Sequence, residues 1–228
     1  MGILQKTDNF LGRYKRIVPF CKALKPVFNI LFYGCCILAA LFVIMAFILI
    51  FINVDVEKML LPPDMSTVRD AAGTITSYSL RLGNGVEIVT DAAAVTLGHI
   101  KLVIYAKLAI WFFTFLCTAP VFSLMAKVFG NISKGYVLNE ENAKYINITG
   151  VIIAGGTFLF TIINNLFNYA QIHKFVTTAQ IHFSFDVQWY GIILGVFIII
   201  IGTIYGYACS LANSTMHSPG TDITVRND

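Results

Sequence analysis

Two groups of polar side chains lie within otherwise apolar stretches of this sequence, and they are the residues best placed to bind a ligand. On a helix that turns about 100° per residue, the first group falls within about 60° and the second within about 80°. The first group is Lys107, Trp111, Thr114 and Thr118, and the second is Thr157, Thr161, Asn164, Asn168 and Gln171. If the two helices pack antiparallel, Lys107 comes near Asn164 and Asn168. The candidate binding residues are Lys107, Thr114, Asn164 and Asn168.

This polar cluster allows two interpretations. An ammonium group beside amides can hold an anionic group or line a small water-filled vestibule, which would suit a transporter, a channel or a lipid-binding protein. Alternatively, the amides and hydroxyls form interhelical hydrogen bonds worth about 0.6 kcal/mol each, while the Lys107 amine extends toward the surface. We favour the structural alternative and keep the first interpretation open.

Glycines at a helical spacing form a second pattern. Gly191-x-x-x-Gly195 and Gly202-x-x-x-Gly206 place four glycines within about 60° on one helix face. Because glycine has no side chain, such a face lets another helix approach backbone to backbone. We predict that these glycines are helix-packing residues. Their partner is a helix of the same chain or of a second copy, and we favour the same chain.

The residues expected of a catalytic or metal site are missing from the sequence pattern. No aspartate or glutamate lies within the apolar stretches, so a carboxylate proton relay has no components. His173 and His182 are close in sequence but lack a cysteine or carboxylate at metal-ligand spacing. No HExxH, GxSxG or phosphate-binding glycine motif occurs, and the cysteines give no disulfide framework. We therefore predict no enzymatic activity, no metal and no cofactor.

The composition explains why polar chemistry is scarce. Of the 228 residues, 57% are hydrophobic and only 12% are charged, with a mean hydropathy of +0.75. Soluble domains carry about 25% charged residues, so this chain has too few charges to cover a water-facing surface of its size. That excludes an ordinary soluble enzyme and a disordered chain. The net charge of +4 is concentrated locally, so it does not indicate nucleic-acid binding.

Four apolar stretches are each long enough to span roughly 30 Å of hydrocarbon, which takes about 20 residues in a helix. Backbone groups in lipid must be satisfied within the segment, so each stretch is predicted to be helical. The expected fold is an all-α integral membrane protein, a four-transmembrane-helix bundle. Its spans are residues 28–53, 102–126, 146–169 and 189–212, and its connecting segments are residues 1–27, 54–101, 127–145, 170–188 and 213–228.

Basic residues predict the orientation. Residues 1–27 hold six lysines and arginines against a single acid, whereas residues 54–101 carry more acids than bases. By the positive-inside rule the N-terminus is cytoplasmic, and four crossings return the C-terminus to that side. We expect a multi-pass protein of a bacterial-type plasma membrane, with membrane lipids as partners. Phe10, Tyr14 and Ile17 share one face of the basic segment, which suits either a helix along the anionic leaflet or a simple topological flank.

The extracytoplasmic segment 54–101 contains the pattern of a small β-hairpin. Residues 78–82 and 86–89 alternate with period two around Gly83-Asn84-Gly85, where Asn-Gly suits a tight turn. An isolated hairpin is marginally stable in water. This one must therefore pack on the helix ends, on a partner or on another copy of the chain. We favour a structural cap over a receptor-like surface.

The segment before the third span carries a helix start and a recognisable motif. Asn139 is a good N-cap, and two glutamates follow it in the first turn. Gly135-x-x-Leu138-Asn139-x-Glu141-Asn142, with Tyr205-x-x-Ala208-x-x-Leu211 and Asp222-Ile223-Thr224-Val225, resembles a bacterial membrane family known as domain of unknown function 2975. Ala208 stands where that family has glycine. The resemblance implies a four-helix membrane protein and no particular activity.

These patterns favour a non-catalytic membrane protein. We expect an accessory, regulatory or immunity-like role, exercised through helix–helix contacts or through the outer loop. The partner would be another membrane protein or a second copy bound through residues 189–212. The alternative is a small transporter, channel or lipid-binding protein that uses the polar cluster around Lys107. No nucleic-acid partner is expected.

Overall fold

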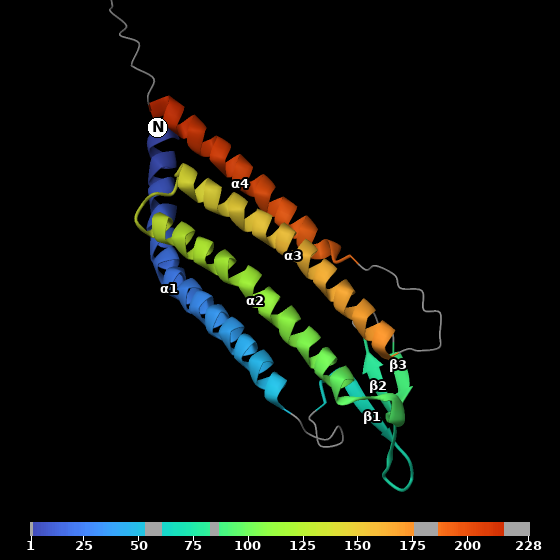
Figure 1. Ribbon diagram of the computed structural model, residues 1–228. Helices are drawn as coiled ribbons and strands as arrows, with labels where there is room; N and C mark the ends of the chain where they lie inside the picture. The colour runs from blue at the N-terminus through green and yellow to red at the C-terminus, as the bar shows by residue number, and fades with distance from the viewer. Residues whose placement is uncertain (1, 53–60, 83–86, 176–186, 217–228) are drawn as a thin grey trace, which may run out of the picture.

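The computed structural model of the protein describes residues 2–52, 61–82, 87–175 and 187–216, with side chains from residue 17 to residue 214 (Figure 1). The start of the first helix and the end of the last lie at one end of the molecule, and the strands lie at the other (Figure 1). In chain order the elements are α1 (Gly2–Phe51), β1 (Met65–Arg69), β2 (Ile75–Arg81), β3 (Glu87–Asp91), η2 (Ala92–Ala94), α2 (Leu97–Ser133), α3 (Glu140–Phe175) and α4 (Trp189–Met216).

The prediction of four apolar helices is confirmed. Each of the four is long and apolar enough to cross a membrane. At 1.5 Å per residue, the 37 residues of α2 make a helix of about 55 Å, longer than roughly 30 Å of hydrocarbon. α2, and α3 with its 36 residues, are thus longer than a span requires, and the sheet packs on one end of each.

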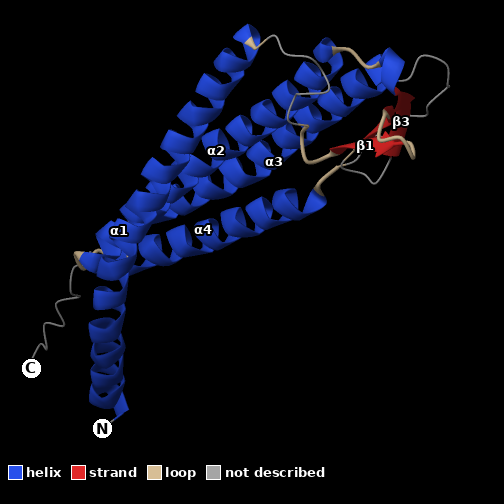
Figure 2. Ribbon diagram, turned by 90° about the horizontal axis from the view of Figure 1, so that it is seen from below, coloured by secondary structure: helices blue, strands red, loops and turns tan. Residues whose placement is uncertain are grey.

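The helices pack in chain order, α1 on α2, α2 on α3 and α3 on α4. Aromatic rings fill the first of these contacts: Phe28 stacks on Phe129 at 5.1 Å and Phe42 on Phe115 at 5.8 Å between ring centroids. Figure 2 shows α1 and α4 diverging toward the end that carries the sheet. Both outer helices leave long rows of apolar side chains exposed, as a helix that faces hydrocarbon does.

The basic segment, residues 1–27, continues into the first apolar helix without a break. It forms the first half of α1, which contains Pro19 and Pro26 and changes direction along its length (Figure 2). Proline lacks the N–H that the helical ladder needs, so bends are expected at such positions. The side chains of Phe10 and Tyr14 lie outside the described residues, so the amphipathic face stays a prediction.

The segment between α1 and α2 folds into an antiparallel sheet in the order β1-β2-β3. The predicted hairpin corresponds to β2 and β3, in which Leu80 pairs with Ile88. Its turn, Gly83-Asn84-Gly85, lies outside the described residues. β1 is a strand not predicted from the sequence, and its Met65 pairs with Leu80 from the other side. β1 is a short strand, Met-Ser-Thr-Val-Arg, with too little apolar alternation to stand out from a loop.

One face of the sheet packs on the ends of α2 and α3. Leu80 and Ile88 from the strands meet Ile100 from α2 and Phe175 from α3 in one hydrophobic cluster. Leu80 is 1% exposed and Ile100 is fully buried. The hairpin was expected to pack on the helix ends, on a partner or on another copy, and the structure shows it on the helix ends.

The start of α3 follows from its capping residues. The N–H of Glu141 donates a hydrogen bond of 3.0 Å to Oδ1 of Asn139, so the predicted N-cap is confirmed. Glu140 and Glu141 lie in the first turn, where the helix dipole favours negative charge. The next residue, Asn142, is fully buried and links back to the end of α2, accepting a 2.9 Å hydrogen bond from Asn131.

Candidate functional site

Lys107 is neutralised by a carboxylate from outside the helices. Its ammonium group forms an ion pair with Asp64, which lies immediately before β1, and the two side chains are 37% and 35% exposed. The backbone of Asp64 is held as well, since its carbonyl accepts a hydrogen bond of 2.7 Å from the N–H of Arg81. This partner is not evident from the sequence, because nothing local relates Asp64 to Lys107.

The polar residues of α3 centre on an asparagine that the sequence analysis did not select. Asn165 is 4% exposed, whereas its neighbour Asn164 is only half-buried. The Asn165 amide donates a hydrogen bond of 2.8 Å to the carbonyl of Thr161. Asn168 and Gln171 are also buried. Thr161, Asn165 and Asn168 recur at the i, i+4, i+7 spacing of one helix face, a signal that was available in the sequence.

Lys107 and the α3 amides do not form one bonded cluster. Among the described residues, no hydrogen bond or ion pair joins Lys107 to Asn164 or Asn168; its ion-pair partner is Asp64. Lys107 pairs with the segment before the sheet, and Asn165 bonds to its own helix. What remains of the candidate site is the space between the two helices.

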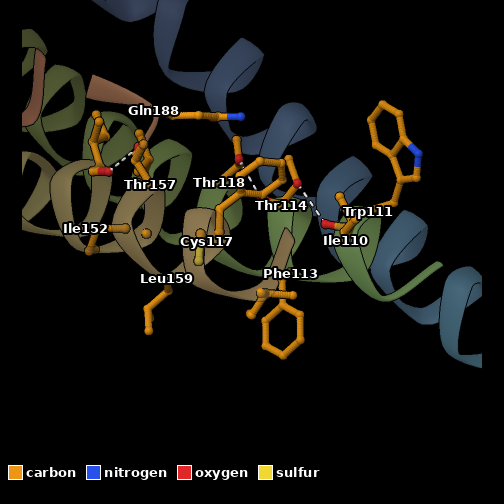
Figure 3. Close-up of a pocket in the computed structure, with 15 residues that line it drawn as sticks. Ile110, Trp111, Phe113, Thr114, Cys117, Thr118, Ile152, Thr157, Leu159 and Gln188 are labelled. Carbon is orange, nitrogen blue, oxygen red and sulfur yellow. Dashed lines mark hydrogen bonds between the residues drawn. The ribbon is translucent and has the colours of Figure 1, made fainter. Parts of the chain in front are cut away.

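A groove of about 570 Å³ lies between α2 and α3 (Figure 3). Of the four candidate binding residues, only Thr114 lines it. The hydroxyls of Thr114 and Thr118 donate to the carbonyls one turn earlier, at 2.8 and 2.7 Å, as the dashed lines in Figure 3 show. Those hydroxyl protons are therefore already used, and the remaining lining is mostly apolar. The groove suits an acyl chain or an apolar side chain better than an ion.

The glycine face of α4 lies against α3. A Cβ added to Gly195 would meet the backbone nitrogen of Ala154 at 2.5 Å and the carbonyl oxygen of Gly150 at 2.6 Å. At Gly206 an added Cβ would lie 3.3 Å from the Cβ of Ala143. Gly191 and Gly202 face the side chains of Thr157 and Asn147 in the same way. All four helix-packing glycines are thus covered by a helix of the same chain.

The α4 glycines pack against a row of small residues on α3 that was not predicted from the sequence. At Gly150 the approach is backbone to backbone, since a Cβ there would lie 2.6 Å from the carbonyl oxygen of Gly195. Ala143, Gly150, Ala154 and Thr157 are small residues at spacings of three, four or seven, which brings them to one side of the helix. A search for small residues on every apolar helix, not only the last, would have found the pair.

The histidines that the structure describes have local roles. Nδ1 of His99 accepts a hydrogen bond of 3.2 Å from the N–H of Thr96 and completes the capping box that starts α2. The ring of His173 packs edge-on against Tyr169, 4.5 Å between centroids. His182 lies outside the described residues. Within the part of the chain that the structure describes, no three histidine, cysteine, aspartate or glutamate side chains gather at a metal-binding distance.

Comparison with known proteins returns no relative: no family model, no curated protein and no solved structure matches this chain. The resemblance based on residues 135–142 and 205–211 stays a prediction, and its third motif, Asp222-Ile223-Thr224-Val225, lies outside the described residues.

Proposed function

We propose that this chain is a non-catalytic, multi-pass membrane protein with an accessory or regulatory role, and that it binds its partner through the outer face of the three-stranded sheet. The observation that carries the proposal is the attachment of this sheet to the helices at three places, with Val68 and Val89 exposed on its outer side. A partner that bound to the sheet would therefore act on α2 and α3, to which the sheet is attached.

The first support is the rigidity of the connection. The inner face of the sheet shares one hydrophobic cluster with α2 and α3. The Lys107–Asp64 ion pair adds a second link, at the edge where β1 begins. Thr90 on β3 adds a third by donating a hydrogen bond of 3.2 Å to the carbonyl of Phe175 at the end of α3. Because the sheet contacts the helices at several points, a displacement of the sheet on binding would also displace the ends of α2 and α3.

The second support is the outer face itself. Side chains alternate across a strand, so Val68 and Val89 lie opposite the buried residues and are 47% and 63% exposed. Around them are small hydroxyl residues, Ser66 and Ser77, on the neighbouring strands. The same face also carries Asp91 and the exposed ion pair Arg81–Glu87, so it offers a partner two apolar side chains flanked by charged ones, the mixture typical of a protein–protein contact.

The α4 glycines are engaged by α3, which removes them as a surface for a second copy. A partner that bound through the glycine face of residues 189–212 would first have to displace α3. The two helices lie so close there that a side chain larger than that of glycine would overlap α3. Partner binding through the outer loop is therefore the better supported of the two routes.

The experiment uses the full chain in the membranes of its own host. A photocrosslinking amino acid is placed at Val89, and in a matched strain at Leu138, which is similarly exposed but lies at the opposite end between α2 and α3. Quantitative mass spectrometry then identifies the attached proteins. The proposal expects one protein attached in high yield from Val89 only, and its loss when Val68 is changed to Asp.

The same crosslinked proteins from both positions, or none from Val89, would contradict the proposal. In that case the groove between α2 and α3 supports a second function, the handling of a lipid or another apolar molecule. Its apolar lining and internally bonded threonines favour that alternative. Substitution of Gly156, whose added Cβ would lie 3.2 Å from the Cβ of Cys117 inside the groove, by Leu would then abolish function.

A further inference from the structure

A polar pocket lies at the end of the molecule opposite the sheet, where α1, the end of α2 and the beginning of α3 meet. Its volume is about 370 Å³. Its lining includes Lys25 and Asn29 from α1, Lys127 and Asn131 from α2, Lys134 from the connection that follows α2, and Tyr145 from α3. The pocket therefore gathers three ammonium groups from separate parts of the chain.

Two of these lysines are held in place by their neighbours. The alkyl chain of Lys25 lies over Gly130, since a Cβ added there would be 3.5 Å from Cδ and Cε and 3.8 Å from Nζ of Lys25. The Nζ of Lys127 lies 5.5 Å from the centre of the Tyr145 ring, within cation–π range. The positions of both amines are thus set by contacts between helices and not only by the solvent.

The charge in this pocket is not balanced by a described acidic group. Within the described part of the chain, the ion pairs are Arg81–Glu87 and Lys107–Asp64, both in or beside the sheet. No described carboxylate pairs with Lys25, Lys127 or Lys134. Lys107, at the other end of α2, shows how this chain neutralises a lysine with its own acid; the three pocket lysines have no such arrangement.

We infer that this pocket binds a phosphate group, and specifically the phosphate of an anionic membrane lipid. Lysine acts as a compact point charge toward phosphate, and the neutral donors Asn29 and Asn131 lie beside the amines. Lys25 and Lys127 each lie near one end of an apolar helix, which is where lipid headgroups meet a spanning helix. The exposed apolar rows of α1 then accept the acyl chains.

The test measures lipid retention by the purified full chain. The protein is exchanged into detergent with phosphatidylglycerol or phosphatidylcholine of identical acyl chains, and bound lipid is counted by native mass spectrometry. The site predicts retention of phosphatidylglycerol over phosphatidylcholine. Lys127→Gln and Lys25→Gln should each reduce retained phosphatidylglycerol about five-fold, the effect of one basic residue at an anionic surface.

Three controls make the outcome decisive. Lys144→Gln removes the same charge from an exposed position on α3 outside the pocket, and retention should stay at the level of the unmodified protein. Lys127→Arg keeps the charge and should retain the lipid, which separates binding from folding. Inorganic phosphate added without lipid distinguishes the source, because a lipid site ignores millimolar phosphate whereas a free-phosphate site binds it. Equal retention of both lipids, or equal losses in Lys127→Gln and Lys144→Gln, would overturn the inference.

Discussion

Lys107 on α2 and Asp64 ahead of β1 form an ion pair that joins the helices to the sheet. The hydrophobic cluster that includes Leu80 and Ile100 makes the second connection between the same two parts. Sheet and helices therefore behave as one unit. Two roles for Lys107 can therefore be told apart by mutation. Replacing a lysine that holds the sheet lowers stability, whereas replacing one that contacts a transported ligand lowers transport.

The first prediction concerns this ion pair. Lys107→Met and Asp64→Asn should each lower the free energy of unfolding by about 1 kcal/mol or less, because both side chains are about a third exposed and solvent screens the pair. The double variant should lose less than the sum of the two single losses, with a coupling of about 0.5 kcal/mol. Thermal unfolding in one detergent measures all three. Fully additive losses would mean that the pair contributes nothing.

The second prediction concerns the point where the backbones of α3 and α4 approach each other. Gly195→Ala should destabilise the protein by about 1–3 kcal/mol, because the added Cβ meets backbone atoms of α3 at 2.5 and 2.6 Å and backbone cannot move aside. Gly155→Ala is the matched control on α3, where an added Cβ meets nothing within 4 Å. That control should be neutral or slightly stabilising, by up to about 1 kcal/mol. Similar unfolding midpoints for both variants would show that α3 and α4 are packed differently.

The third prediction tests a paired substitution further along the same interface. Gly202→Ala should destabilise the protein, because its Cβ would meet the side chain of Asn147. Asn147→Ala alone should cost little, since the buried Oδ1 of Asn147 has no hydrogen-bond partner among the described residues. The double variant should then recover part of the Gly202→Ala loss. Unfolding midpoints of the four proteins form the cycle, and a double variant worse than both singles would contradict it.

The fourth prediction distinguishes the two neighbouring asparagines of α3. Asn165→Ala should lower stability by about 0.6 kcal/mol or more, because a buried amide that bonds to Thr161 is lost. Asn164→Ala should have a smaller effect, because this side chain is only half-buried. Thermal unfolding of the two variants side by side checks the order. The reverse order would show that Asn164, and not Asn165, contributes more to stability among the polar residues of α3.

Several features were predictable because they depend on residues close together in the sequence. The apolar runs, the N-cap at Asn139 and the alternation within β2 and β3 each reflect neighbouring side chains and a fixed period. The same reasoning failed for β1, since a strand of five mostly polar residues acquires its identity from pairing with β2 and not from its own composition.

The four long apolar helices follow from length and hydropathy alone, because a helix satisfies its backbone hydrogen bonds within the segment. Which residues contact one another depends instead on how the helices and the sheet pack. A helical wheel shows that Lys107 and the four α4 glycines each lie on a face, but it carries no information about what that face contacts. Asp64 contacts Lys107, and Gly150 contacts Gly195, because segments that are distant along the chain pack together.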